Sequence, residues 1–117
     1  MGCFDPITRK AEQATQYLID SARDIAAAKA DLVKHENMLR VVKAIAMKHS
    51  GETAVSAQER EAYASDQYKR AVQDLTQATE QHELLRTKRE AAKMQIEFWR
   101  SLNANQRDAQ RGMGSAA

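Results

Sequence analysis

The residues of this chain that could do chemistry are mostly cations, and one row of them recurs near the C-terminus. Arg86, Lys93, Arg100 and Arg107 stand seven residues apart, which places them along one side of a coiled-coil helix. Such a stripe can follow the phosphates of a nucleic acid strand without reading its bases. One interpretation of the row is therefore a site for a single-stranded polyanion.

The same row can instead be structural and pair with acidic residues of a neighbouring helix. If the chain turns back on itself near residue 52, the expected pairs are Arg86 with Asp20, Lys93 with Glu12, and Arg100 with Asp5. Arg107 and Arg111 would extend beyond such a partner helix and are the cations left for phosphates.

A second group of cations precedes the expected turn of the chain. Arg40, Lys43, Lys48 and His49 lie where acidic residues are sparse until Glu52. Cations at this place can bind phosphates, and they also suit the negative end of a helix dipole. The sequence leaves both interpretations open.

Catalysis and metal binding are not expected. His35, His49 and His82 are scattered and form no pair at ligand spacing on one helix face. No glycine-rich phosphate loop or nucleophile motif is present. The lone Cys3 allows no intrachain disulfide, which is typical of a reducing compartment. We therefore expect a protein that is not an enzyme, with no cofactor and no metal.

The elements that must position the cations are long helices, because small and apolar residues recur at heptad spacing. The first tract has two rows, Ala11, Leu18, Ile25, Leu32, Leu39, Ala46 and Ala14, Ser21, Ala28, His35, Val42. The second tract has the rows Ala64, Ala71, Ala78, Leu85, Ala92, Trp99 and Tyr68, Leu75, His82, Arg89, Ile96. The pattern predicts an all-α fold, a long antiparallel helical hairpin or coiled coil in one domain spanning 1–117.

Local signals divide this domain. Asp5 before Pro6 is typical of a helix start, and Gly51 can take the left-handed conformation that ends a helix. Ser56 and Glu59 have the spacing of a capping box, and Ser65 can cap a further helix. The sequence predicts a helix over about 6–49, a loop over 50–56, a helix over about 57–109 with an optional break near Ser65, and a disordered tail over 110–117.

Some apolar side chains indicate contacts between chains. Trp99, with Leu85 and Ile96, is a candidate interface residue, although the single tryptophan could also pack within the chain or stack on a base. A second set lies off the principal rows and needs a neighbour: Ile19, Val33, Val41, Ile45, Val72 and Leu84. We expect a homo-oligomer.

One segment resembles a known family. Lys43-Ala44 is followed after five residues by Ser50-Gly51, with Tyr17 upstream, and this is similar to a motif of the UvsY family of phage recombination mediators. The family has an arginine after the Lys-Ala pair, where this chain has Ile45. The resemblance implies binding of single-stranded DNA and of a RecA-like recombinase, and Lys43 is the one functional residue that it carries over.

These observations together predict a phage-encoded, oligomeric, non-catalytic mediator-like protein that binds single-stranded DNA in the cytoplasm of the host cell. No apolar run is long enough to span a membrane. The candidate DNA-binding residues are Lys43, Lys48, Arg100, Arg107 and Arg111. The alternative is a structural or adaptor coiled coil, a virion component or an inhibitor of a host protein, that binds no nucleic acid.

Overall fold

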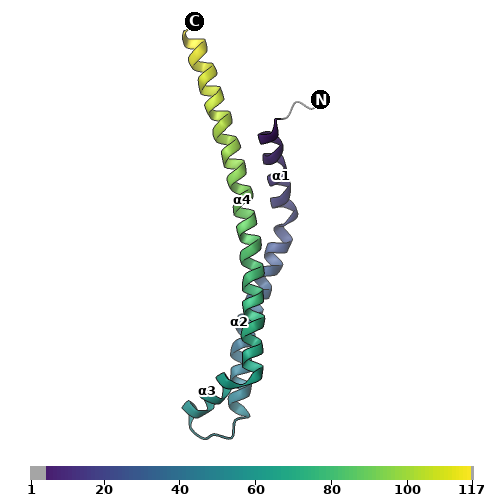
Figure 1. Cartoon of the computed structure of the whole chain (residues 1–117), viewed down its shortest axis with the longest axis vertical. Helices are drawn as coiled ribbons and strands as arrows, with labels where there is room; N and C mark the ends of the chain where they lie inside the picture. Colours follow the sequence, from purple (N-terminus) through teal and green to yellow (C-terminus); the bar gives the residue numbers. More distant parts are fainter. Residues whose placement is uncertain (1–4, 117) are drawn as a thin grey trace. The chain divides into compact units, whose positions relative to one another are not determined.

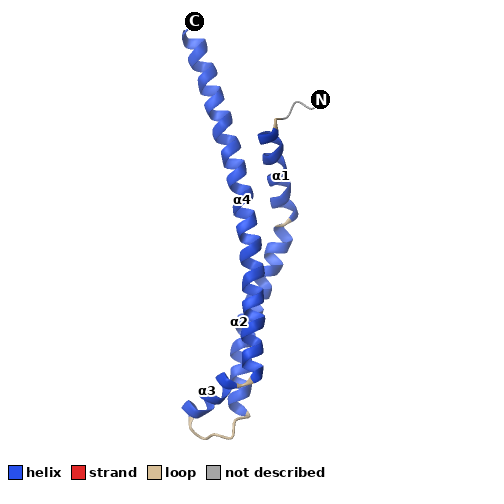
Figure 2. Cartoon of the chain, in the orientation of Figure 1, coloured by secondary structure: helices blue, strands red, loops and turns tan. Residues whose placement is uncertain are grey.

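The computed structural model describes the backbone of residues 5–116 and the side chains of residues 5–112. Every regular element in this range is a helix, so the predicted all-α helical hairpin is confirmed (Figures 1 and 2). The helices, in chain order, are α1 (Pro6–Asp20), α2 (Ala22–Lys48), α3 (Val55–Ala64) and α4 (Asp66–Ala116).

The helices form two compact units. Unit 1 joins the chain up to Arg23 with the part from Arg86 onward, and unit 2 comprises Asp24–Leu85. In unit 1, α1 runs antiparallel to the C-terminal part of α4, since Thr8 contacts Trp99 while Leu18 contacts Arg89. In unit 2, α2 leads through α3 back into the N-terminal part of α4. The helix α4 thus contributes to both units.

The predicted heptad rows are the buried faces of these helices. In unit 1 the most buried apolar residues are Ala11, Ala14 and Ala92, and in unit 2 they include Ala28, Ala62, Ala71 and Ala78. Alanine lets the two backbones approach closely and costs little side-chain entropy. No large side chain in the described part is fully buried. Each unit is therefore held by a thin, alanine-rich seam.

The predicted burial was wrong for one residue of the seam rows. Ala64 is exposed, whereas Ala62, two residues earlier, has no exposed surface. The reason is the break at Ser65, whose extended backbone (φ −70°, ψ 149°) separates α3 from α4. The heptad register of α4 does not continue through such a break. Ser65 itself behaves as predicted, since its Oγ accepts the N–H of Tyr68 at 3.2 Å.

The first helical tract is interrupted where the sequence predicted one helix over 6–49. Ser21 separates α1 from α2 with φ −89° and ψ −1°, and its side chain is buried. In an unbroken helix the carbonyl of Leu18 would accept the N–H of Ala22. Here that carbonyl accepts a bond from α4 instead.

The helix ends agree with the sequence in part. Asp5 caps α1 as predicted, and its carboxylate accepts the Thr8 N–H at 2.7 Å. The prediction of a capping box at Ser56 and Glu59 was wrong. The helix α3 begins at Val55, and its N-cap Ala54 makes no side-chain hydrogen bond. Instead, Gln58 Nε2 donates to the Glu52 carbonyl at 2.9 Å and fixes the loop.

The prediction that Gly51 adopts the left-handed conformation was also wrong. No described glycine has a positive φ. The helix α2 ends through a tighter turn, in which the Ser50 N–H donates to the Met47 carbonyl at 3.2 Å, and such i→i−3 bonds satisfy terminal carbonyls without glycine.

The C-terminal helix is longer than predicted. The segment 110–117 was expected to be a disordered tail, but α4 continues to Ala116. Gln110 and Arg111 are good helix formers, and a glycine inside a helix costs only about 1 kcal/mol relative to alanine. Gly112 and Gly114 therefore do not stop a helix that already has its nucleus.

Candidate nucleic-acid interface

The five candidate DNA-binding residues lie in both units. Arg100, Arg107 and Arg111 belong to α4 in unit 1, and Lys43 and Lys48 belong to α2 in unit 2. They do not form one cluster within a single unit.

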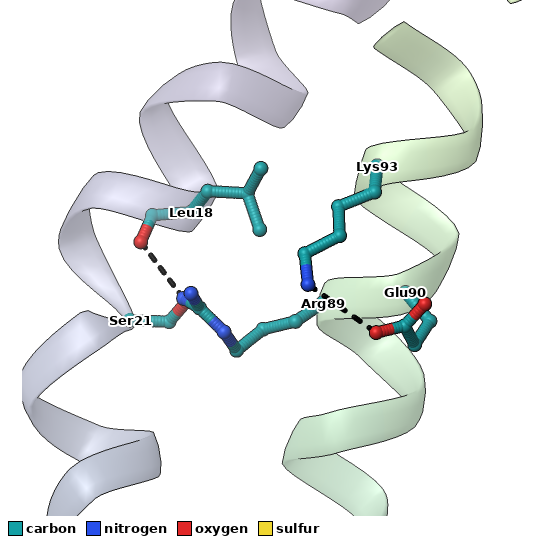
Figure 3. Close-up of polar contacts among 5 residues, drawn as sticks. All are labelled: Leu18, Ser21, Arg89, Glu90 and Lys93. Carbon is teal, nitrogen blue, oxygen red and sulfur yellow. Dashed lines mark hydrogen bonds and ion pairs between the residues drawn. The ribbon is translucent and has the colours of Figure 1, made fainter. Parts of the chain in front are cut away.

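The basic row of α4 finds acids on its own helix. Lys93 Nζ lies 3.3 Å from Glu90 Oε1, and Arg100 Nη1 lies 3.1 Å from Glu97 Oε1 (Figure 3 shows the first pair). The predicted partners Glu12 and Asp5 were thus wrong for these two cations. A partner three residues away on the same helix needs less side-chain ordering than one on another helix. Both pairs are more than half exposed, so their charges remain accessible to an anion.

Two further cations lie toward the C-terminal end of α4, Arg107 and Arg111. Arg111 Nη1 lies 4.0 Å from Asp108 Oδ1, at the outer limit of an ion pair. Arg107 is exposed and makes no ion pair or hydrogen bond with any other residue in the described part of the chain. A phosphate could therefore bind Arg107 without displacing a described partner.

An open hollow of about 650 Å³ lies along this part of α4. At one end the Trp99 indole Nε1 donates to Thr8 Oγ1 at 3.1 Å, near the start of α1. One aromatic side chain, two guanidinium groups and three side-chain amides line the hollow. An aromatic ring can stack on a base, and guanidinium and amide N–H groups can donate to phosphates. Its lining comprises Trp99, Arg100, Asn103, Ala104, Gln106, Arg107 and Gln110.

Arg89 has a role that the sequence did not reveal. It occupies a seam row of α4, and its Nη1 donates to the Leu18 carbonyl at 2.8 Å and to Ser21 Oγ at 2.7 Å. Figure 3 shows this side chain reaching from α4 to α1. Arg89 thus satisfies a carbonyl at the break between α1 and α2. The one local signal was a cation among small and apolar seam residues.

Lys43 is engaged within unit 2. Its Nζ lies 4.8 Å from the centre of the Tyr63 ring and 3.9 Å from Glu59 Oε1. The pKa of Lys43 is raised, chiefly by its side-chain contact with Tyr63 and also by the nearby Glu59 carboxylate. Tyr63 in turn packs edge-on against Tyr68, with ring centroids 5.1 Å apart. These contacts tie α3 to α2, so a phosphate would have to compete with them.

Lys48 has a different environment. It is exposed in the last turn of α2, where a cation interacts favourably with the helix dipole. It has no ion pair among the described residues. Lys48 is thus accessible, and its part in DNA binding stays a prediction.

The two histidines of the seam rows have different surroundings. His35 Nε2 lies 3.5 Å from Asp31 Oδ1 on the same helix. His82 Nδ1 is buried and accepts or donates no hydrogen bond among the described residues, and Glu83 Oε1 lies 3.7 Å away. Within residues 5–112 no group of three His, Cys, Asp or Glu side chains could hold a metal ion. Cys3 lies outside the described residues. None of the described helices has an apolar stretch long enough to cross a bilayer.

The predicted interface residues Leu85, Ile96 and Trp99 are half-buried on the seam rows. Ile96 and Trp99 line a groove between α1 and α4 together with Thr8, Ala11 and Thr15. Packing within the chain therefore accounts for Ile96 and Trp99. The predicted off-row apolar residues are all exposed: Ile19, Val33, Val41, Ile45, Val72 and Leu84.

Further exposed apolar residues were missed, and two of them lie on α4 in unit 1. Met94 is 71% exposed and Phe98 is 57% exposed. The spacing of Ala91, Met94 and Phe98, with steps of three and four, would have revealed them as a second row on α4.

Comparison of the chain with protein-family models, with curated proteins and with solved structures gave no match.

Proposed function

We propose that this chain is a non-catalytic protein of the recombination-mediator kind, which binds single-stranded DNA on the C-terminal part of α4. The observation that carries the proposal is the hollow in which Trp99, Arg100 and Arg107 lie together with amide side chains. Single-strand binding sites combine an aromatic face for bases with cations for the backbone. The resemblance around Lys43 adds the expectation of a RecA-like recombinase as a partner.

The mechanism needs no base reading. Arg107 binds one phosphate directly, and Arg100 binds another while it exchanges its exposed contact with Glu97 for the strand. An exposed ion pair contributes about 1 kcal/mol or less, so this exchange costs little. A base that stacks on the Trp99 indole adds about 1–3 kcal/mol. Such contacts favour a flexible single strand over a duplex, whose bases are already stacked.

The test uses the single tryptophan of the chain as a probe. An oligo-dT strand should quench Trp99 fluorescence at low salt, and duplex DNA of the same length should do so more weakly. Arg107→Gln should weaken the single-strand titration several-fold. Arg23→Gln removes an equal charge from an exposed position of unit 1 outside the hollow. This variant should leave the affinity for the single strand nearly unchanged. Equal losses in the two variants would show that the hollow is not the site.

The structural or adaptor coiled coil remains the second candidate. The pairs Glu90–Lys93 and Glu97–Arg100 favour it, since they offset much of the basic row of α4. On this alternative the wild-type protein shows no quenching by single-stranded DNA at ~50 mM salt, a concentration at which phosphate contacts are strong.

A further inference from the structure

In unit 1, α4 is apolar on two faces. Ala92, Ile96 and Trp99 form its face toward α1 and are buried or half-buried. Ala91, Met94 and Phe98 are exposed on another face. On a helix of 3.5 residues per turn the two faces are nearly opposite. The contacts of unit 1 thus use only one of the two.

The exposed face has the geometry of a coiled-coil seam. Ala91 and Phe98 stand seven residues apart and form one row of the seam. The second row has the same spacing and consists of Thr87, Met94 and Ser101. A narrow stripe of this kind packs against one other helix, whereas the core-facing side of a globular protein's helix is broader. The occupant is therefore a helix.

Charge next to the stripe selects the orientation of that helix. Glu90 and Glu97 flank one side of the stripe, and Gln95 and Leu102 flank the other. If two copies of α4 packed antiparallel, Glu90 of one would face Glu97 of the other. In a parallel pair each glutamate faces Gln95 or Leu102 of the second copy, so this repulsion is absent.

We propose that this face is the interface of a parallel homodimer, in which α4 of one chain packs against α4 of a second copy. The stripe is then self-complementary, as a twofold interface requires. Ala91, Met94 and Phe98 each meet their own counterpart in successive layers. Burial of the exposed Met94 and Phe98 side chains supplies the driving force.

The dimer has a consequence for DNA binding, and this consequence alone rests on the proposed function. Parallel packing places the two hollows with Trp99 and Arg107 at the same end of the pair. One strand can then contact both, and linked contacts bind more tightly than either alone. A monomeric variant should lose at least about tenfold in affinity for a long strand.

The first experiment measures mass in solution at micromolar concentration for two matched variants. Phe98→Glu places a charge in the stripe, and Ile19→Glu changes an apolar side chain of unit 1 that is 65% exposed outside it. Wild type and Ile19→Glu should be dimers, and Phe98→Glu should be a monomer with unchanged helicity by circular dichroism. A monomeric wild type, or a dimeric Phe98→Glu, would overturn the proposal.

The second experiment tests orientation in a Cys3→Ser background. Ala91→Cys and Ser101→Cys are made separately, and each is oxidised. Ten residues of helix span about 15 Å, and a disulfide needs Cα atoms within about 7 Å. A parallel dimer crosslinks at both positions, whereas an antiparallel one crosslinks at one or neither. Mass and crosslinking are measured without DNA, so a failed dimer is distinguishable from failed DNA binding.

Discussion

Arg89 and Lys93 are both cations of α4, one helical turn apart, but their surroundings differ. Arg89 bonds across to a backbone carbonyl and a buried serine, whereas Lys93 pairs with Glu90 on the surface. A hydrogen bond from a charged donor in a half-buried seam is worth more than an exposed ion pair. The position of a cation relative to the seam therefore decides what it contributes.

We predict that Arg89→Ala lowers the free energy of unfolding by about 1–3 kcal/mol, because it leaves the Leu18 carbonyl and the Ser21 hydroxyl without this donor. Lys93→Ala is the matched control and should change it by less than about 0.5 kcal/mol. Urea denaturation followed by circular dichroism measures both. Equal effects would mean that the Arg89 bonds contribute nothing beyond surface charge.

At the start of α1, the pKa of Asp5 is lowered because its carboxylate accepts the Thr8 N–H. A lowered folded-state pKa gives stability that is present above the unfolded value of about 3.9 and is lost as pH falls through the lower folded value. Asn caps helices as well as Asp but does not titrate in this range. As pH falls below ~4, the NMR chemical shift of the Thr8 amide should change in the wild-type protein, because Asp5 takes up a proton. In Asp5→Asn this chemical shift should stay constant. A shift of the same size in both would contradict the capping argument.

At the scale of the helices, the heptad rows predicted which faces are buried, and the structure agrees except at Ala64. The rows succeed because burial against one neighbour imposes a seven-residue period. The break at Ser21 was not predictable in this way. It involves Arg89, 68 residues along the chain, and neither glycine nor proline marks it. Local signals also failed at Ser56, where the bond from Gln58 to Glu52 fixes a different start for α3.

The break at Ser65 gives a sharp prediction for two alanines of α3. Ala62→Leu inserts bulk where no surface is exposed and should destabilise the protein by about 1–3 kcal/mol, the usual cost of overpacking. Ala64→Leu adds the same bulk at an exposed position and should change stability little. Thermal denaturation compares them. If Ala64→Leu were the more damaging, the continuous heptad row expected from the sequence would be right.

At the scale of the whole chain, the sequence located the basic row but not its local partners. Residue spacing gives the face of a helix, whereas the rotamers that join Glu90 to Lys93 and Glu97 to Arg100 depend on three-dimensional detail. The same limit applies to Lys43, since its contacts with Tyr63 and Glu59 depend on how α3 folds back. The hollow on α4 could be identified only from the structure, whereas the second apolar face was already present in the spacing of Ala91, Met94 and Phe98.

The salt dependence of affinity for single-stranded DNA shows directly whether cations of α4 bind phosphates. Each phosphate contact to a single strand contributes about −0.7 to the slope of log affinity against log salt. Arg107→Ala combined with Arg111→Ala should weaken binding at low salt and flatten the slope by roughly 1–1.5 units, with helicity and mass unchanged. Binding of single-stranded DNA by α4 would be contradicted if the wild-type protein failed to bind it at ~50 mM salt and micromolar concentration. An unchanged slope in the double variant would contradict phosphate contacts by Arg107 and Arg111.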